Sequence, residues 1–169
     1  PAMKIVRYVL APLLGIIVFM GGVSGFEAIG HAIYPPPVEI AELSRAYGDA
    51  MFSGDSERLA EVEREMTPVL TAWIAEAPLG PLLAVVLSWI GGGLVGALTA
   101  AAIAPTGKFW FAILIGAFDV LGIVMVTSQF SHPVWMPLVG VSGTLIVTVG
   151  VGLLLGRVSS ARDDAPRPT

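Results

Sequence analysis

Glu27, His31 and His132 are the residues whose types could hold a metal ion or move a proton. Glu27 and His31 stand four residues apart in an apolar segment, so a helix places them on one face. His132 lies in a short loop between two other apolar segments, at a similar expected depth. A carboxylate and two imidazoles, with water in the fourth position, make a common open zinc site. These three residues form our candidate metal or proton site.

The same three residues also fit simpler roles. Glu27 can hydrogen-bond a histidine or a backbone group near the lipid headgroups, and His132 can cap the turn before Pro133. They can also help to bind a lipid or a small ligand. The Glu-x-x-x-His spacing is common in proteins, so the sequence leaves these alternatives open.

Asp119 is an acid in the middle of an apolar segment, eleven residues into the range 109–129. A carboxylate that faces lipid is costly, so the side chain should face the protein interior or be protonated. No Lys or Arg occurs at a matching depth. Thr144, Thr148, a backbone carbonyl exposed at a glycine or a group of another subunit could serve as its partner. We predict an interhelical hydrogen bond, with a proton or cation pathway as the alternative.

The sequence lacks the residues and motifs that most other catalytic and metal-binding sites require. It contains no Cys, which excludes disulfides and thiolate metal sites. It has no glycine-rich phosphate loop, nucleophile elbow or His-Glu-x-x-His helix. No basic patch indicates binding to nucleic acid. We therefore predict neither enzyme activity nor a required cofactor, and a divalent metal is the one cofactor left open.

Four long apolar segments must position these residues. The chain is 55% hydrophobic and 13% charged, whereas soluble domains are about 45–50% apolar and about 25% charged. A helix of about 20 apolar residues crosses a hydrocarbon core of about 30 Å. The sequence thus predicts an all-α membrane protein with four transmembrane helices, at residues 6–33, 81–104, 109–129 and 134–157.

The charges predict which way the four helices run. If all four segments cross the membrane, six basic residues fall on one side: Lys4, Arg7, Lys108, Arg157, Arg162 and Arg167. The segment 34–80 falls on the other side, with nine acidic and three basic residues. Because cytoplasmic loops carry the excess of Lys and Arg, we expect both termini in the cytoplasm of a bacterium and residues 34–80 outside its inner membrane.

The outer segment 38–77 reads as a helical hairpin. Apolar residues recur at helical spacing on both sides of Ser53-Gly54-Asp55, where Asp55 or Ser56 can cap the second helix. The apolar stripe of each helix should cover the outer ends of the bundle, the headgroup zone or a partner protein. The tail 158–169 is polar and contains proline, which predicts disorder.

Small residues recur at every fourth position on two of the predicted spans. Such stripes let helix backbones approach closely in lipid, where apolarity alone drives no association. We expect them to pack the four helices together, or to let one helix face another chain. The stripes are Ser88, Gly92, Gly96, Ala100 and Ala104 on one span, and Gly140, Thr144, Thr148, Gly152 and Gly156 on another.

Short motifs at the outer ends of the spans carry a resemblance. They are Glu27-x-x-x-His31-x-x-Tyr34-Pro35-Pro36-Pro37, Trp73-Ile74-Ala75 before a Pro-Leu-Gly turn, and His132-Pro133-x-Trp135. With these motifs the chain from Val6 to Arg157 resembles a set of small bacterial four-transmembrane-helix proteins. The resemblance implies the topology given above and no activity.

The predicted spans contain few polar residues, which favours a non-catalytic function. Our first prediction is a structural or accessory subunit of a membrane assembly, in contact with lipids and with partner chains or further copies of itself. One alternative is a small proton- or metal-handling transporter that would use Asp119, Glu27, His31 and His132. The other is a membrane enzyme that would use Glu27, His31 and His132.

Overall fold

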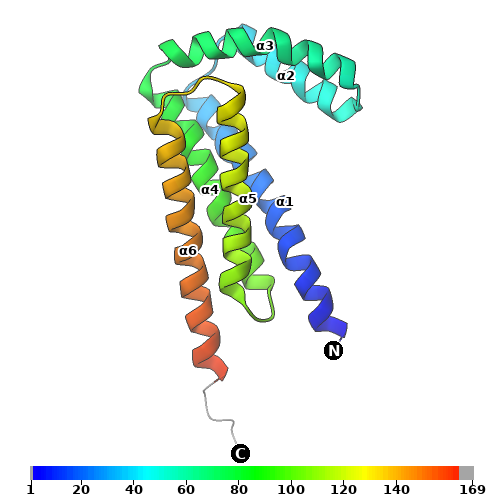
Figure 1. Ribbon diagram of the computed structural model, residues 1–169, viewed down its shortest axis with the longest axis vertical. Helices are drawn as coiled ribbons and strands as arrows, with labels where there is room; N and C mark the ends of the chain where they lie inside the picture. The colour runs from blue at the N-terminus through cyan, green and yellow to red at the C-terminus, as the bar shows by residue number, and fades with distance from the viewer. Residues whose placement is uncertain (1, 164–169) are drawn as a thin grey trace, which may run out of the picture.

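The computed structural model describes residues 2–163, which fold into helices joined by short connections (Figure 1). The described residues contain no strand. The helices are α1 (Ala2–Ile33), α2 (Val38–Ser53), α3 (Ser56–Glu76), α4 (Leu79–Ile103), α5 (Lys108–Gln129) and α6 (Trp135–Asp163).

Helices α1, α4, α5 and α6 form a bundle, and each is long and apolar enough to cross a membrane. The four predicted apolar helices are thus present, which is consistent with a multi-pass membrane protein. Large apolar side chains cover the outside of the bundle, for example Ile17 at 63% exposure and Ile146 at 72%. Such a surface is suited to lipid and would be costly in water.

The closest helix pair is α1 with α4, and glycines make the approach possible. A Cβ atom at Gly96 would lie 2.9 Å from the backbone oxygen of Gly15, and one at Gly22 would lie 3.2 Å from Cα of Gly92. Real Cβ atoms are rarely that close to a neighbouring backbone. All five residues of the predicted α4 stripe, Ser88, Gly92, Gly96, Ala100 and Ala104, are buried.

The predicted α6 stripe also faces the interior of this chain. Gly140 lies against the ring of Trp89, and Gly152 lies against Phe109. Thr144 and Thr148 are fully buried between them, whereas Gly156 is half-buried near the far end of α6. Both stripes therefore pack helices of one chain against each other.

Helices α2 and α3 form the predicted hairpin. Gly54 takes the left-handed conformation at φ 73°, which ends α2. The Asp55 carboxylate then accepts hydrogen bonds from the backbone N–H groups of Glu57 at 3.1 Å and Arg58 at 2.9 Å, which starts α3. Figure 1 shows the hairpin lying across one end of the bundle and projecting beyond it.

The last turns of α3 hold the hairpin on the bundle. Ile74 is buried in a cluster with residues of α4, α5 and α6, which are Leu82, Val86, Trp89, Ile123 and Met136. The apolar stripe of α3 thus covers the ends of the bundle helices at this point, which is the first of the roles expected for it.

The helix ends differ from the predicted bounds at a few places. Helix α4 begins at Leu79 rather than at residue 81, because Pro81 fits within a first helical turn, where no N–H partner is needed. Helix α6 continues to Asp163, so residues 158–163 of the predicted disordered tail are helical. No Gly or Pro interrupts that stretch. Residues 164–169 lie outside the described part.

Candidate functional site

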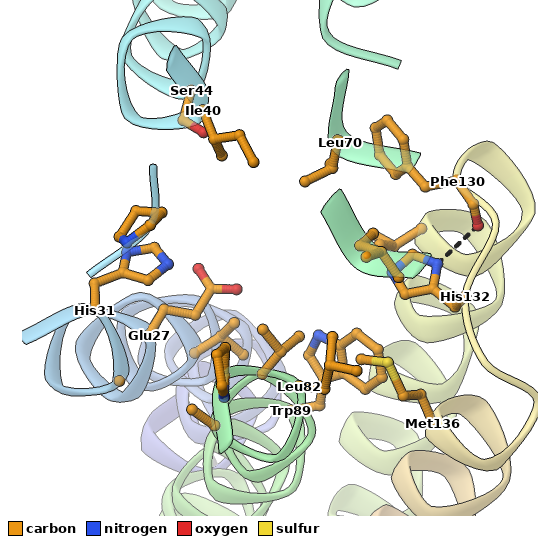
Figure 2. A pocket seen from close by; sticks show the side chains of 18 of the residues that line it. Glu27, His31, Ile40, Ser44, Leu70, Leu82, Trp89, Phe130, His132 and Met136 are labelled. Atoms are coloured by element: carbon orange, nitrogen blue, oxygen red, sulfur yellow. Dashed lines mark hydrogen bonds between the residues drawn. The ribbon is translucent and has the colours of Figure 1, made fainter. Parts of the chain in front are cut away.

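A cavity of about 690 Å³ lies beneath the hairpin, at the end of the bundle where α3 docks. Each of the described helices contributes to its lining, together with the loop before α6. Figure 2 shows an open centre with side chains of α1, α2, α3 and α4 around it. The cavity is thus bounded by both the bundle and the hairpin.

The walls of the cavity are mostly apolar and aromatic. Helix α4 supplies Leu82, Val85 and Trp89, and α3 supplies Leu70, Trp73 and Ile74. Phe19 and Val23 come from α1, Ile123 and Val126 from α5, and Met136 from α6. Pockets for small ligands have this composition, with a few polar groups that fix orientation.

Helices α1 and α5 both line the cavity and also contact each other. They touch through the rings of Phe19 and Phe118, with centroids 5.9 Å apart, and through those of Tyr8 and Phe111 at 6.1 Å. Both contacts lie on the side of the cavity away from the hairpin. Nearer the hairpin, Glu27 of α1 and Val126 of α5 line the cavity instead.

Glu27 and His31 lie next to each other on the α1 wall, as their spacing predicts. Figure 2 shows the Glu27 carboxylate pointing into the cavity, with the His31 ring beside it. Glu27 is half-buried and His31 is exposed. Among the described residues, neither a hydrogen bond nor an ion pair joins Glu27 to His31 or to a backbone group, so the hydrogen bond considered for Glu27 is not formed.

His132 lies on the opposite side of the cavity from Glu27 and His31 (Figure 2). Its Nδ1 donates a hydrogen bond of 2.7 Å to the backbone oxygen of Phe130, since a carbonyl can only accept. The imidazole also packs against the rings of Trp89 and Phe130, at centroid distances of 6.5 and 6.4 Å. These contacts hold the loop before Pro133, which fits the turn-capping role.

The three residues do not converge on one point in this arrangement. Within residues 2–163, no group of three His, Asp or Glu side chains is placed to hold a metal ion. The predicted ligand set of Glu27, His31 and His132 is therefore not formed here. A metal or proton role for these residues stays a prediction.

Asp119 is buried at the middle of α5, with 1% of its surface exposed. The Thr144 hydroxyl on α6 donates a hydrogen bond of 2.8 Å to Asp119 Oδ2, so one of the two predicted threonine partners is the partner found. Gly93 on α4 leaves the room, because a Cβ there would lie 2.5 Å from the same oxygen. Asp119 also lines the cavity, which gives the cavity an acid deep in the bundle as well as Glu27 nearer its end.

Sequence reasoning located the polar residues but missed the cavity that they share. Glu27, Asp119 and His132 come from different helices and a loop, and their common surroundings depend on how the helices rotate and cross. The aromatic residues Trp73 and Trp89 also line the cavity. Trp73 precedes the second predicted span and Trp89 is its ninth residue, so neither position in the sequence indicates a shared cavity.

Comparison with known proteins adds no relative of this chain. No protein-family model matches it, and no curated protein or solved structure matches it either.

Proposed function

We propose that this protein binds an amphipathic, membrane-soluble molecule in the cavity beneath its hairpin. One observation carries the proposal: a cavity of about 690 Å³ at one end of a membrane bundle, with apolar walls and two acids. The volume lies within the range of about 300–1,000 Å³ that is usual for small-ligand sites. An apolar molecule with a polar end matches these walls.

The surroundings of the cavity support entry from the lipid. Helices α1 and α5 both line the cavity, and both carry exposed apolar side chains on their outer surfaces. A ligand that dissolves in the bilayer reaches such a site without crossing the polar hairpin. A water-soluble metabolite would lose its hydration against Leu82, Val85 and Trp89 with few polar groups to replace it.

The topology proposed with this function has both termini in the cytoplasm and the hairpin outside the inner membrane of a bacterium. Its support is the segregation of charge: Lys4, Arg7, Lys108 and Arg157 all belong to the bundle end opposite the hairpin. The hairpin segment 34–80 carries nine acidic residues against three basic ones. The rule that Lys and Arg stay on the cytoplasmic side gives the orientation.

Because the chain contains no Cys, single cysteines report this topology directly. We expect Ala60→Cys, on the exposed hairpin, to react with a membrane-impermeant maleimide in intact spheroplasts. Thr106→Cys, in the connection between α4 and α5, should react only after the membrane is broken. Both positions are exposed, so access to the reagent differs only by the side of the membrane. The reverse pattern would contradict the orientation.

Filling the cavity tests the binding function. Gly122 lines the cavity, and a Cβ at this position meets no atom within 4 Å, so Gly122→Phe should fold with its ring in the cavity. We expect native mass spectrometry of wild-type protein, released from mild detergent, to retain one co-purified lipid-like molecule per chain. Gly122→Phe should lose at least about nine-tenths of that bound fraction.

Gly150→Phe is the matched control for this experiment. Gly150 also has no atom within 4 Å of an added Cβ, and it lies on α6 away from the cavity. Its bound fraction should equal that of the wild type. If Gly122→Phe retains the molecule as well as Gly150→Phe does, the cavity is not the binding site and the proposed function fails.

The functions predicted from the sequence stay predictions beside this one. An accessory role in a membrane assembly is compatible with ligand binding, because the outer surface of the bundle can face lipid or a partner equally well. A metal site formed jointly by Glu27, His31 and His132 is not supported by the arrangement in Figure 2, whereas a proton- or cation-handling role that uses Asp119 stays a prediction.

A further inference from the structure

The charges that line the cavity are separated by depth. Two acidic residues of the membrane helices line the cavity, Glu27 on α1 and Asp119 on α5. Among the described residues, the Lys or Arg side chain that lines the cavity is Arg45, which is exposed on α2 in the hairpin. His31 and His132 also lie toward the hairpin end. The deep part of the cavity therefore favours positive charge.

Among the described residues, neither acid forms an ion pair with a Lys or Arg side chain, and the His31 ring is the basic group beside Glu27. The sequence has no Lys or Arg between residues 8 and 33 or between residues 109 and 156, the ranges that hold Glu27 and Asp119. Asp119 receives one hydrogen bond from Thr144, a neutral group. A carboxyl group at bilayer depth is stable as the neutral acid or beside an opposite charge. A bound cation can supply that charge by taking the place of the proton.

The aromatic walls add a second attraction for a cation. Trp89 is buried at 6% exposure and lines the cavity with Phe19, Trp73 and Phe130. The faces of aromatic rings, most strongly of indole, attract ammonium and other organic cations, and the attraction increases when the site is dry. A charge spread over an organic group loses little hydration on entry, whereas a metal ion would lose much.

From the cavity, its two acids and its aromatic walls, we infer that the ligand is a lipophilic organic cation. Its charge lies in the part of the cavity between Glu27 and the deeper Asp119, and its apolar body lies against the walls formed by α3, α4 and α5. This inference rests on the proposed binding function and adds the sign of charge to it. An anion of the same shape should bind more weakly, because the deep part of the cavity offers it two acids and no Lys or Arg side chain.

Two ions of nearly equal shape and opposite charge test the inference. Tetraphenylphosphonium is a cation and tetraphenylborate is an anion. Equilibrium dialysis against purified protein in dodecyl maltoside measures the binding of each ion, and dialysis against empty micelles corrects for binding to detergent. We expect saturable binding of one phosphonium per chain. Tetraphenylborate should bind at least about tenfold more weakly.

Charge-neutralising variants locate the effect. Glu27→Gln and Asp119→Asn should each weaken phosphonium binding by about tenfold, which corresponds to about 1.4 kcal/mol. The amide oxygen introduced by Asp119→Asn still accepts from the Thr144 hydroxyl, and Glu27 makes no hydrogen bond among the described residues, so both variants should fold. Asp49→Asn, on the exposed face of α2 outside the cavity, is the matched control and should bind as the wild type does.

Three results would overturn the inference. They are equal binding of the two ions, no saturable phosphonium binding, or phosphonium binding that is unchanged in both Glu27→Gln and Asp119→Asn. The proposed function is judged separately by lipid retention in Gly122→Phe. If that variant loses its ligand while the two ions bind equally, the cavity binds a neutral or zwitterionic amphiphile and only the sign of charge is wrong.

Discussion

Gly92→Leu is expected to prevent stable folding of this protein in detergent. A Cβ atom at Gly92 would lie 3.0 Å from the backbone oxygen of Phe19 and 3.0 Å from the backbone nitrogen of Val23, and it would also meet the Val23 side chain. Backbone atoms cannot turn aside as a flexible side chain can. The larger residue must therefore push α1 away from α4.

The consequence is large because small residues are what hold these two helices together. Lipid is as apolar as leucine, so helix association in a membrane depends on close packing rather than on the hydrophobic effect. Separating α1 and α4 also opens the neighbouring contacts at Gly96 and Gly22, which are equally close. We expect a loss of about 3 kcal/mol or more, above the usual cost of an overpacked site. Thermal melting in detergent measures this loss of stability, and gel filtration shows how much of the protein remains folded and unaggregated.

Gly25→Leu is the matched control for Gly92→Leu. It makes the same replacement in a membrane helix, but Gly25 is exposed on α1 and an added Cβ meets nothing within 4 Å. Both variants gain the same helix propensity over glycine. Gly25→Leu should elute and melt as the wild type does. A Gly92→Leu protein with the wild-type melting temperature would show that the close approach does not stabilise the fold.

The spans and caps were predictable because their signals are local. A run of apolar residues is long enough for a span regardless of its neighbours, and the Asp55 side chain caps α3 by accepting from the backbone N–H groups two and three residues later. The stripe spacing also predicted which face of α4 is buried, since residues four apart share a face. Each of these features depends on a few consecutive turns.

The sequence predicted which residues belong to the site but not how they pair in the structure. Thr144 and Thr148 lie one turn apart on the same face of α6, so spacing could not choose between them as partners of Asp119. In the structure the Thr148 hydroxyl donates to the backbone oxygen of Thr144 at 2.8 Å, and its side chain fills the space beside Gly116. The choice depends on the relative height of α5 and α6, which a loop of a few residues sets.

The separation of His132 from Glu27 and His31 has a similar cause. Equal depth along the membrane normal is necessary for three residues to meet, but it does not fix their positions around the bundle. His132 follows α5, whereas Glu27 and His31 belong to α1, and the cavity separates His132 from the other two residues. Depth can be read from a sequence of spans, whereas the order of helices around the bundle cannot.

Thr144→Val is expected to destabilise the protein by about 1–2 kcal/mol. Valine keeps the shape of threonine and removes the hydroxyl, so Asp119 loses the 2.8 Å hydrogen bond that it accepts in a buried position. An orphaned buried acceptor costs about 1–3 kcal/mol in water-soluble proteins. Interhelical hydrogen bonds in membranes contribute about 0.6 kcal/mol on average and at most about 1.7. A carboxyl acceptor in a buried place should fall in the upper part of that range.

Thr148→Val and a double-mutant cycle separate this bond from general effects of the replacement. Thr148 is equally buried on the same helix, but its hydroxyl donates within α6, so its loss leaves no side chain of another helix without a partner. In an Asp119→Ala background, Thr144→Val should cost less than about 0.5 kcal/mol, because the acceptor is already gone. Unfolding by SDS titration in mixed micelles measures all four corners of the cycle. An equal cost for Thr144→Val with and without Asp119 would show that this pair does not couple α5 to α6.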